Sequence, residues 1–131
     1  MPALVPELSV TDIAASRRFY CDILGFSVRY ERADEGFAYL ELGEAELMLD
    51  QLGAGRDWLT ASLERPLGRG VNFQIEVSAL APILARVERA GLLLFTPTET
   101  KTYSVGSAQV TQHQFCVQDP DGYLLRFFET A

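Results

Sequence analysis

The pattern of hydrophobic and polar positions in this chain occurs twice. Residues 4–10 alternate as in a β-strand, and apolar positions then recur at helical spacing up to Leu24, where Gly25 can end a helix. The same succession returns later: Val77 stands 67 residues after Val10, and Gly91 stands 66 residues after Gly25. We therefore expect two copies of one strand–helix–strands module, with a ligand site between their two half-sheets.

A stretch without sustained periodicity joins the two expected modules. Module one covers about residues 1–50, the linker about 51–69 and module two about 70–131, within a single domain 1–131. Helices are predicted over 13–24 and from Leu80 to Ala90, and strands over 4–10, 26–32, 37–42, 45–49, 71–77, 92–96, 101–106, 109–118 and 123–129. Runs of strands with one helix per module indicate an α+β fold, with the helices on one sheet face and a concave, partly open face opposite.

Composition excludes several functions. The 131 residues are 48% hydrophobic and 22% charged, which is ordinary for a globular domain with a core. No apolar run approaches 18 residues and no secretory signal is evident, so we expect a cytoplasmic protein without a membrane partner. The net charge of −7 argues against nucleic acid and mildly favours a cationic ligand, although solubility alone explains it. Cys21 and Cys116 lack metal-site or disulfide spacing and are expected to be free thiols.

Strand alternation predicts which side chains line the open face. That face mixes carboxylates and amides with aromatic residues, which suits a ligand-binding cup, and suits a dimer interface equally well. The two can coexist. The residues predicted to bind a ligand there are Glu7, Phe37, Tyr39, Glu46, Met48, Asn72, Gln74, Glu76, Arg126 and Phe128. Trp58 in the linker is added as an aromatic ring suited to stacking on a planar group; the alternative is that it anchors the loop in the core.

Two segments carry a family resemblance. Residues 10–26 (VTDIAASRRFYCDILGF) resemble the first helix of the vicinal oxygen chelate superfamily, and residues 119–129 (DPDGYLLRFFE) resemble its closing strand. That superfamily contains glyoxalase I, ring-cleaving dioxygenases, and fosfomycin- and bleomycin-resistance proteins. The resemblance implies two tandem βαβββ modules that form a curved mixed sheet around a cup, with the helices outside, and usually a homodimer.

Metal-using members of this superfamily place one ligand on each of four strands. The matching positions here are Val5, Met48, Asn72 and Arg126. Valine has no donor atom, methionine suits soft metals, and arginine carries a permanent positive charge. The single histidine, His113, is predicted to lie on another face. We therefore expect no metal and no cofactor, and so no electrophilic metal catalysis.

The remaining resemblance, carried by residues 70–77 (GVNFQIEV) and 124–127 (LLRF), is to the metal-free bleomycin-resistance-like branch. It implies a protein that binds a small, cationic or aromatic ligand at a dimer interface, as in antibiotic sequestration. Acidic cup residues suit a cationic ligand; they are Glu7, Glu46, Asp50 and Glu76. Two alternatives stay open. One is a cofactor-free or unusually metallated lyase, isomerase or dioxygenase-like enzyme, with Glu7, Glu46 or Glu76 as general base. The other is a small-ligand sensor.

Overall fold

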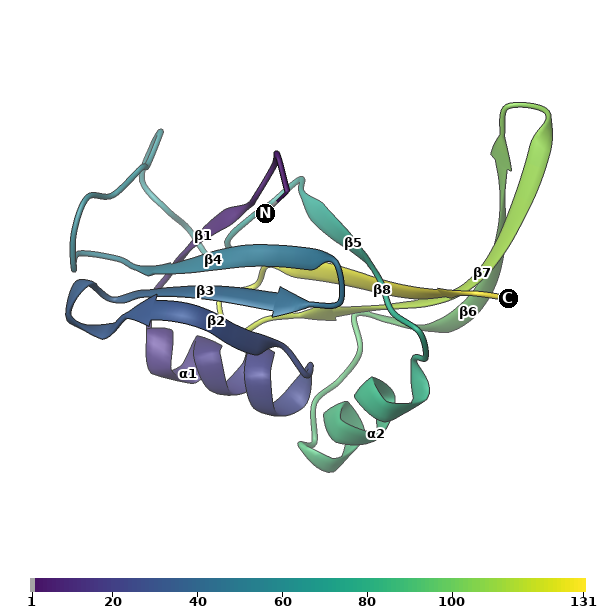
Figure 1. Ribbon diagram of the computed structural model, residues 1–131, viewed down its shortest axis with the longest axis horizontal. Helices are drawn as coiled ribbons and strands as arrows, with labels where there is room; N and C mark the ends of the chain where they lie inside the picture. The colour runs from purple at the N-terminus through teal and green to yellow at the C-terminus, as the bar shows by residue number, and fades with distance from the viewer. Residues whose placement is uncertain (1) are drawn as a thin grey trace.

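Two four-stranded mixed sheets form the computed structural model of this protein, which describes residues 2–131 (Figure 1). Sheet A has the order β1-β4-β3-β2 and sheet B the order β5-β8-β7-β6. The strands are β1 (Glu7–Val10), β2 (Ser27–Arg32), β3 (Phe37–Leu42), β4 (Ala45–Gln51), β5 (Asn72–Glu76), β6 (Thr96–Val105), β7 (Ala108–Gln118) and β8 (Leu124–Thr130). In each sheet the first strand pairs in parallel with the fourth, and the other pairs are antiparallel. The predicted α+β fold with tandem modules is confirmed.

The helix of module one starts at a side-chain cap and widens toward its end. Asp12 accepts hydrogen bonds from the backbone N–H groups of Ala14 (3.1 Å) and Ala15 (3.2 Å) at the start of α1 (Ile13–Arg18). The helix continues as a π-helical segment, η1 (Phe19–Ile23), and Gly25 ends it with a φ of 94°. In module two, α2 (Ala81–Arg89) carries Pro82 in its first turn, where the missing N–H leaves no bond unmade. A 3₁₀ turn, η2 (Ala33–Glu35), joins β2 to β3.

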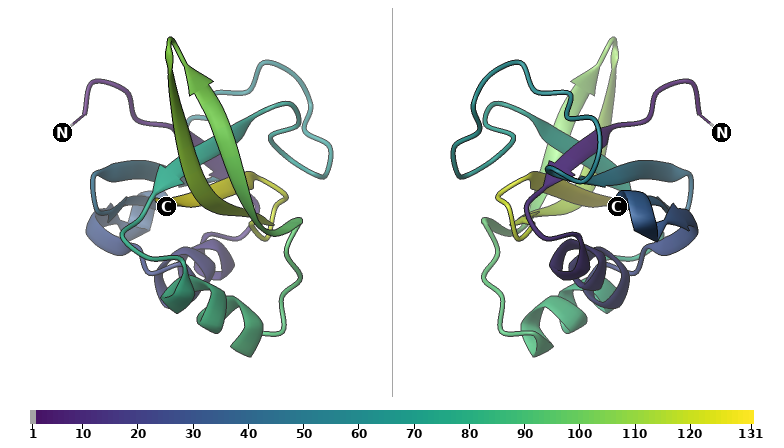
Figure 2. Two further views of the ribbon diagram at one scale, coloured as in Figure 1. Left: turned by 90° about the vertical axis from the view of Figure 1, so that its right-hand side faces the viewer. Right: turned by 90° about the vertical axis from the view of Figure 1, so that its left-hand side faces the viewer.

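One hydrophobic core lies between the helices and the sheets. Side chains from both modules meet in it, including Leu8 and Leu49 of sheet A, Phe115 and Phe127 of sheet B, and Tyr20 of η1. Both helices lie on the same side of the molecule, while the loop 52–71 and the β6–β7 hairpin stand on the other side (Figures 1 and 2). The opposite face of each sheet is therefore left without a covering helix. Within residues 2–131 no helix is both long and apolar enough to cross a bilayer.

Three predicted strand boundaries are wrong. The first strand starts at Glu7 rather than at residue 4, since Pro6 has no N–H to contribute to a ladder. Residues 92–95 form no strand, because the N–H of Leu92 returns to the carbonyl of Val87 at the end of α2 (3.2 Å). The predicted strands over 92–96 and 101–106 are instead a single strand, β6, which lies at the sheet edge and so tolerates Pro97.

A bulge in β2 changes which side chains reach the open face. Val28 pairs with Leu40, but Tyr30 pairs with Tyr39, so Arg29 is an extra residue in the strand. Regular alternation would place Tyr30 beside Val28 on the helix side. The bulge turns Tyr30 to the open face, where it joins residues of β3.

Candidate functional site: the open faces of the two sheets

The open face of sheet A has an aromatic floor, formed by Tyr30, Phe37 and Tyr39. Tyr30 stacks on Tyr39 with ring centroids 5.0 Å apart and lies 6.0 Å from Phe37. The guanidinium of Arg32 lies 4.0 Å above the centroid of the Phe37 ring. Phe37 and Tyr39 are 6% and 2% exposed, so neighbouring side chains hold both rings in place. Tyr30 is 41% exposed, so its ring is the part of the floor that a flat ligand group can reach.

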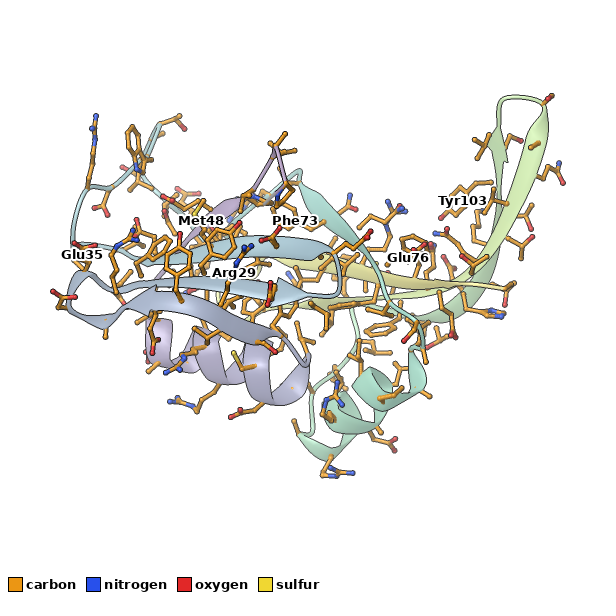
Figure 3. All side chains as sticks on the ribbon, viewed as in Figure 1. Arg29, Glu35, Met48, Phe73, Glu76 and Tyr103 are labelled. Atoms are coloured by element: carbon orange, nitrogen blue, oxygen red, sulfur yellow. The ribbon has the colours of Figure 1, made fainter. Side chains whose placement is uncertain are left out.

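Beside the floor, Glu46 is neutralised by Arg29. An Arg29 nitrogen donates to Glu46 Oε1 at 2.5 Å, and its guanidinium lies 5.8 Å from the centroid of the Tyr39 ring. Figure 3 labels Arg29 and Met48 on this part of sheet A. The Tyr39 hydroxyl is buried and has no hydrogen-bond partner among the described residues. Burial, followed by the nearby Glu46 carboxylate, raises the pKa of Tyr39. The site thus holds a neutral phenol hydroxyl beside the Arg29–Glu46 pair.

A hollow of ≈ 360 Å³ opens between sheet A and the inter-module loop. It is lined by Glu7, Arg32, Glu35, Phe37, Asp50, Ala54, Gly55, Arg56 and Trp58. Trp58 is 65% exposed, with the Arg56 guanidinium 4.0 Å from its ring centroid. Trp58 therefore does not anchor the loop in the core, which was the alternative left open from the sequence.

Two carboxylates in this hollow lack a counter-ion. Glu7 and Asp50 have no Lys, Arg or His nitrogen within 4.0 Å in the described part of the chain. Burial first and then the charge of Asp50 raise the pKa of Glu7. Burial and then the charge of Asp57 raise the pKa of Asp50. The positive charge of Arg32 offsets part of the rise for both Glu7 and Asp50. With three carboxylates and two guanidinium groups in its lining, the hollow keeps a net negative charge, which favours the arrival of a positive charge.

The open face of sheet B has different chemistry. Asn72, Gln74 and Glu76 on β5 pair in register with Leu124, Arg126 and Phe128 on β8, so all six side chains share this face. The Nε of Arg126 is buried and finds no hydrogen-bond acceptor among residues 2–131, and no carboxylate lies within 4.0 Å of its guanidinium.

A hydrogen-bonded amide cluster continues this face toward the β6–β7 hairpin. Gln114 accepts from Gln112 (3.0 Å) and donates to Glu99 (2.8 Å), and it also exchanges hydrogen bonds with the Tyr103 hydroxyl. Gln112 and Gln114 are 6% and 5% exposed. Sequence analysis did not identify Gln112, Gln114, Glu99 or Tyr103 as site residues. The two glutamines at alternate positions of β7, on the face opposite buried Phe115, could have indicated this cluster.

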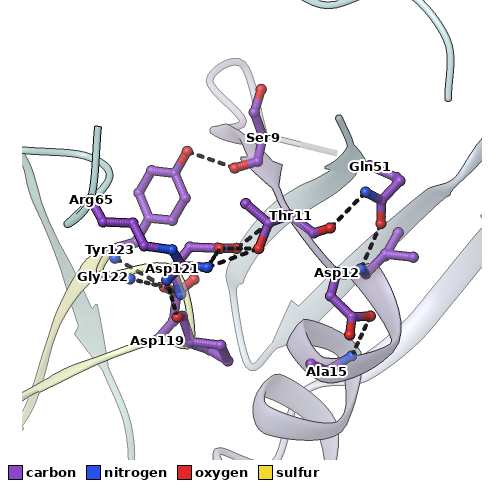
Figure 4. Close-up of polar contacts among 12 residues, drawn as sticks. Ser9, Thr11, Asp12, Ala15, Gln51, Arg65, Asp119, Asp121, Gly122 and Tyr123 are labelled. Carbon is purple, nitrogen blue, oxygen red and sulfur yellow. Dashed lines mark hydrogen bonds and ion pairs between the residues drawn. The ribbon is translucent and has the colours of Figure 1, made fainter. Parts of the chain in front are cut away.

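The two modules are joined by the turn that precedes β8 (Figure 4). Asp119 Oδ1 accepts the backbone N–H groups of Asp121, Gly122 and Tyr123, each at 2.9 Å. Its Oδ2 accepts the Tyr20 hydroxyl at 2.8 Å, and burial raises the pKa of Asp119 against the lowering effect of these hydrogen bonds. The helical segment of module one is thereby attached to the turn of module two.

Asp121 makes a second connection. It accepts the Thr11 hydroxyl (2.5 Å) and backbone N–H (3.2 Å), and it pairs with Arg65 of the inter-module loop (2.9 Å). Asp121 is 1% exposed, so water competes little for these bonds. Both turn carboxylates therefore serve the junction and fix the two open faces relative to each other.

The predicted site residues divide into two groups. Glu7, Phe37, Tyr39, Glu46 and Met48 lie on the open face of sheet A, and Glu7, Phe37 and Trp58 share the hollow. Asn72, Gln74, Glu76, Arg126 and Phe128 lie on the open face of sheet B. No ion pair joins the groups in the described chain. Sequence alternation missed Tyr30 and Arg32, because the β2 bulge leaves no recognisable mark such as a glycine. Arg29 was also not among the predicted site residues, although alternation opposite Val28 places it on the open face.

The four positions that match metal ligands in the resembled superfamily do not suit a metal ion. Val5 lies outside β1, Met48 packs beside Tyr39 in the register of sheet A, and Arg126 places a cation on the closing strand. Across residues 2–131 no group of three or more His, Cys, Asp or Glu side chains is placed to hold an ion. His113 lies on the other face of β7 and contacts Thr100 (2.9 Å).

Comparisons with known proteins agree with this fold. The sequence profile of the Glyoxalase/Bleomycin resistance protein/Dioxygenase superfamily matches residues 4–127. A bleomycin resistance protein of Geobacillus stearothermophilus is 28% identical over 133 positions, which cover 95% of this chain and 94% of that protein. The crystal structure of TioX from Micromonospora sp. ML1 has a TM-score of 0.73 at 19% identity, with all of both chains covered. A superfamily member from Vibrio splendidus 12B01 is 44% identical over 97% of each chain, with a TM-score of 0.45. This chain therefore belongs to the Glyoxalase/Bleomycin resistance protein/Dioxygenase superfamily.

Proposed function

We propose that this protein binds a small cationic, aromatic molecule on its open sheet faces and sequesters it without chemical change. The observation that carries this proposal is the hollow beside sheet A. There, two carboxylates without counter-ions, Glu7 and Asp50, lie next to Phe37 and the exposed ring of Trp58.

Both features of the hollow favour the same class of ligand. A cation can neutralise Glu7 and Asp50, neither of which forms an ion pair within the described residues. A planar group can stack on Trp58 at the rim or on the Tyr30 ring of the aromatic floor. Bleomycin, a glycopeptide antibiotic, is the first candidate because a relative that covers nearly the whole chain is named a bleomycin resistance protein.

We further propose that the binding unit is a homodimer. The open faces have no covering layer within one chain, and beyond β8 the β6–β7 hairpin continues as two exposed strands with Val105 58% and Val110 38% exposed. Isolated two-stranded ribbons are marginal in water, so a second copy that covers the hairpin and an open face would stabilise both. Such a copy would also close the hollow into a cup.

Thermal unfolding with bleomycin and with benzylamine, a simple aromatic cation, tests the binding proposal. Binding stabilises the folded state by about 2.7 kcal/mol at a hundredfold excess over Kd, which corresponds to roughly 10 °C for a chain of this size. Stabilisation by neither compound, at concentrations up to tens of millimolar for benzylamine, would contradict the proposal.

Two substitutions in the same loop separate binding from folding. Trp58→Ala removes the exposed ring and should weaken binding of bleomycin by about 5- to 30-fold, with little change in melting temperature. Leu59→Ala is the matched control, because Leu59 is also exposed (41%) but does not line the hollow. Equal effects of both substitutions on affinity would place the ligand elsewhere.

A cofactor-free enzyme with Glu7 as general base is the second candidate function. The raised pKa of Glu7 favours this role, since a base is most effective when its pKa approaches the working pH. Glu46 is less suited, because Arg29 already neutralises it. Recovery of bleomycin or benzylamine unchanged after prolonged incubation, by mass spectrometry, supports sequestration; a product lost in Glu7→Gln would support the enzyme.

A further inference from the structure

We infer that Arg126 is the receptor for a carboxylate group of the ligand, so that the natural ligand carries an acidic group in addition to its cationic aromatic part. Bleomycin, which has no free carboxyl group, then represents only the cationic aromatic part. This inference rests on the proposed function and assigns the second open face a role in it. The evidence is the unfilled hydrogen-bonding capacity of a half-buried guanidinium on sheet B.

Arg126 differs from the other half-buried arginine of the chain. Arg86 on α2 is also partly buried, but its guanidinium donates to the carbonyls of Ile23 (2.6 Å) and Leu24 (3.4 Å). Arg126 has a buried Nε without an acceptor and no ion pair within residues 2–131. A buried donor that has lost water without gaining an acceptor is unfavourable, and the cost is greatest for a charged group.

The strands beside Arg126 offer no carboxylate to neutralise it. In the sheet register it lies between Gln74 on β5 and Cys116 on β7, both uncharged. Glu76 lies one position further along the same face, opposite Phe128, and is exposed and beyond ion-pair distance. Glu129 pairs with His113 in the register and points to the opposite face. The described residues therefore supply no acceptor for the buried Nε of Arg126 and no counter-ion for its charge, and we infer that a ligand supplies both.

A carboxylate fits this position better than a neutral acceptor. The planar guanidinium presents parallel N–H groups that match the two oxygens of a carboxylate. Leu124 and Phe128 flank Arg126 on β8, and the amide of Gln74 is beside it, so part of the ligand can rest on apolar surface while a second donor is in reach. Flanking apolar groups also exclude water and strengthen a charge-assisted hydrogen bond.

Benzoate and benzamide test the inference, because they have nearly the same shape and differ in charge. Their dissociation constants are to be measured by NMR titration for the full chain and for Arg126→Met, Arg126→Lys and Arg89→Met. Arg89 is exposed at the end of α2, so Arg89→Met removes the same charge away from the open faces. We expect benzoate to bind at least about 10-fold more tightly than benzamide, a preference lost in Arg126→Met, partly kept in Arg126→Lys and unchanged in Arg89→Met.

Equal affinities for benzoate and benzamide in the unaltered protein would overturn the inference, even if Arg126→Met fails to fold. So would a benzoate affinity that falls equally in Arg126→Met and Arg89→Met. Dissociation of a dimer by Arg126→Met, with no benzoate binding to the unaltered protein, would assign Arg126 to a carboxylate of a second copy and also overturn it. Benzylamine binding, tested through Asp50→Asn, reports on the proposed function separately, so either claim can fail alone.

Discussion

Tyr20→Phe should destabilise this protein strongly, although it removes a single oxygen atom. Tyr20 is 0% exposed, and its hydroxyl donates to Asp119 Oδ2 at 2.8 Å. That bond joins residues 99 positions apart and connects η1 of module one to the turn before β8 of module two. The substitution therefore tests whether the turn carboxylates connect the modules.

The expected loss follows from the charge and burial of the acceptor. Asp119 is 5% exposed, and without Tyr20 its Oδ2 keeps no hydrogen bond within the described chain, while Oδ1 keeps three backbone N–H donors. A hydrogen bond to a charged group contributes about 1.5–3 kcal/mol. For 131 residues this lowers the melting temperature by roughly 5–15 °C.

The effect should depend on pH. Burial raises the pKa of Asp119 in the folded state, because the ionised carboxylate is less favourable in the folded protein than in the unfolded chain. This cost disappears as pH falls through the raised pKa and Asp119 becomes protonated. The Tyr20 hydrogen bond lowers this pKa, and its loss in Tyr20→Phe raises it further. The difference between the two proteins is therefore largest near neutral pH and shrinks on acidification, as Asp119 becomes protonated in both.

Tyr123→Phe provides a matched control. The Tyr123 hydroxyl also makes one hydrogen bond between modules, to the backbone carbonyl of Ser9 at 2.8 Å, but this acceptor is uncharged. Its loss should cost about 0.5–1.5 kcal/mol with no such pH dependence. Urea unfolding at several pH values measures both variants. If Tyr20→Phe costs no more than Tyr123→Phe, or is insensitive to pH, Asp119 is not the charged acceptor described above.

Three further outcomes are expected. Asp50→Asn should raise the melting temperature at pH 7, because the folded state raises the pKa of Asp50 and so disfavours its charge. The gain in melting temperature should vanish as pH falls through the range in which Asp50 becomes protonated. A lower melting temperature of Asp50→Asn at pH 7 would contradict this expectation. Elemental analysis of protein purified without chelators should find no stoichiometric transition metal. One metal ion per chain that is lost in Met48→Ala would contradict the conclusion that Val5, Met48, Asn72 and Arg126 do not suit a metal ion. Light scattering should give twice the chain mass of 14.6 kDa, whereas a 14.6 kDa species at micromolar concentration would refute the homodimer.

Much of the fold followed from local patterns in the sequence. The end of the first helix at Gly25 was readable because it depends on one residue and its neighbours. The faces of Met48 and Arg126 were predictable because side chains alternate with period two in any regular strand. These features are set by covalent geometry and need no knowledge of distant contacts.

The missed bulge in β2 depends on contacts with other strands. It places Tyr30 on the open face, where Tyr30 stacks on Tyr39 of β3 while Arg29 pairs with Glu46 of β4. Residues 92–95 have the composition of a strand, but the N–H of Leu92 bonds the carbonyl of Val87 at the end of α2, five residues earlier. That miss is local, because the helix end and the strand pattern compete for the same residues, whereas the bulge was decided by contacts between strands.

The register of the two sheets shows that equivalent positions of the two modules carry side chains of different chemistry. Glu7 pairs with Met48 on sheet A, as Gln74 pairs with Arg126 on sheet B, and the next strands place Tyr39 and Cys116 at equivalent positions. One step further along, Asp50 with Phe37 on sheet A corresponds to Phe128 with Gln114 on sheet B. A centre built from like ligands on both modules would need similar residues at such equivalent positions, and none of these pairs is alike. Within residues 2–131 the duplicated frame instead presents the unpaired carboxylates Glu7 and Asp50 with aromatic rings on one face, and an amide cluster with the unpaired Arg126 on the other, which suits a ligand whose two ends differ in chemistry.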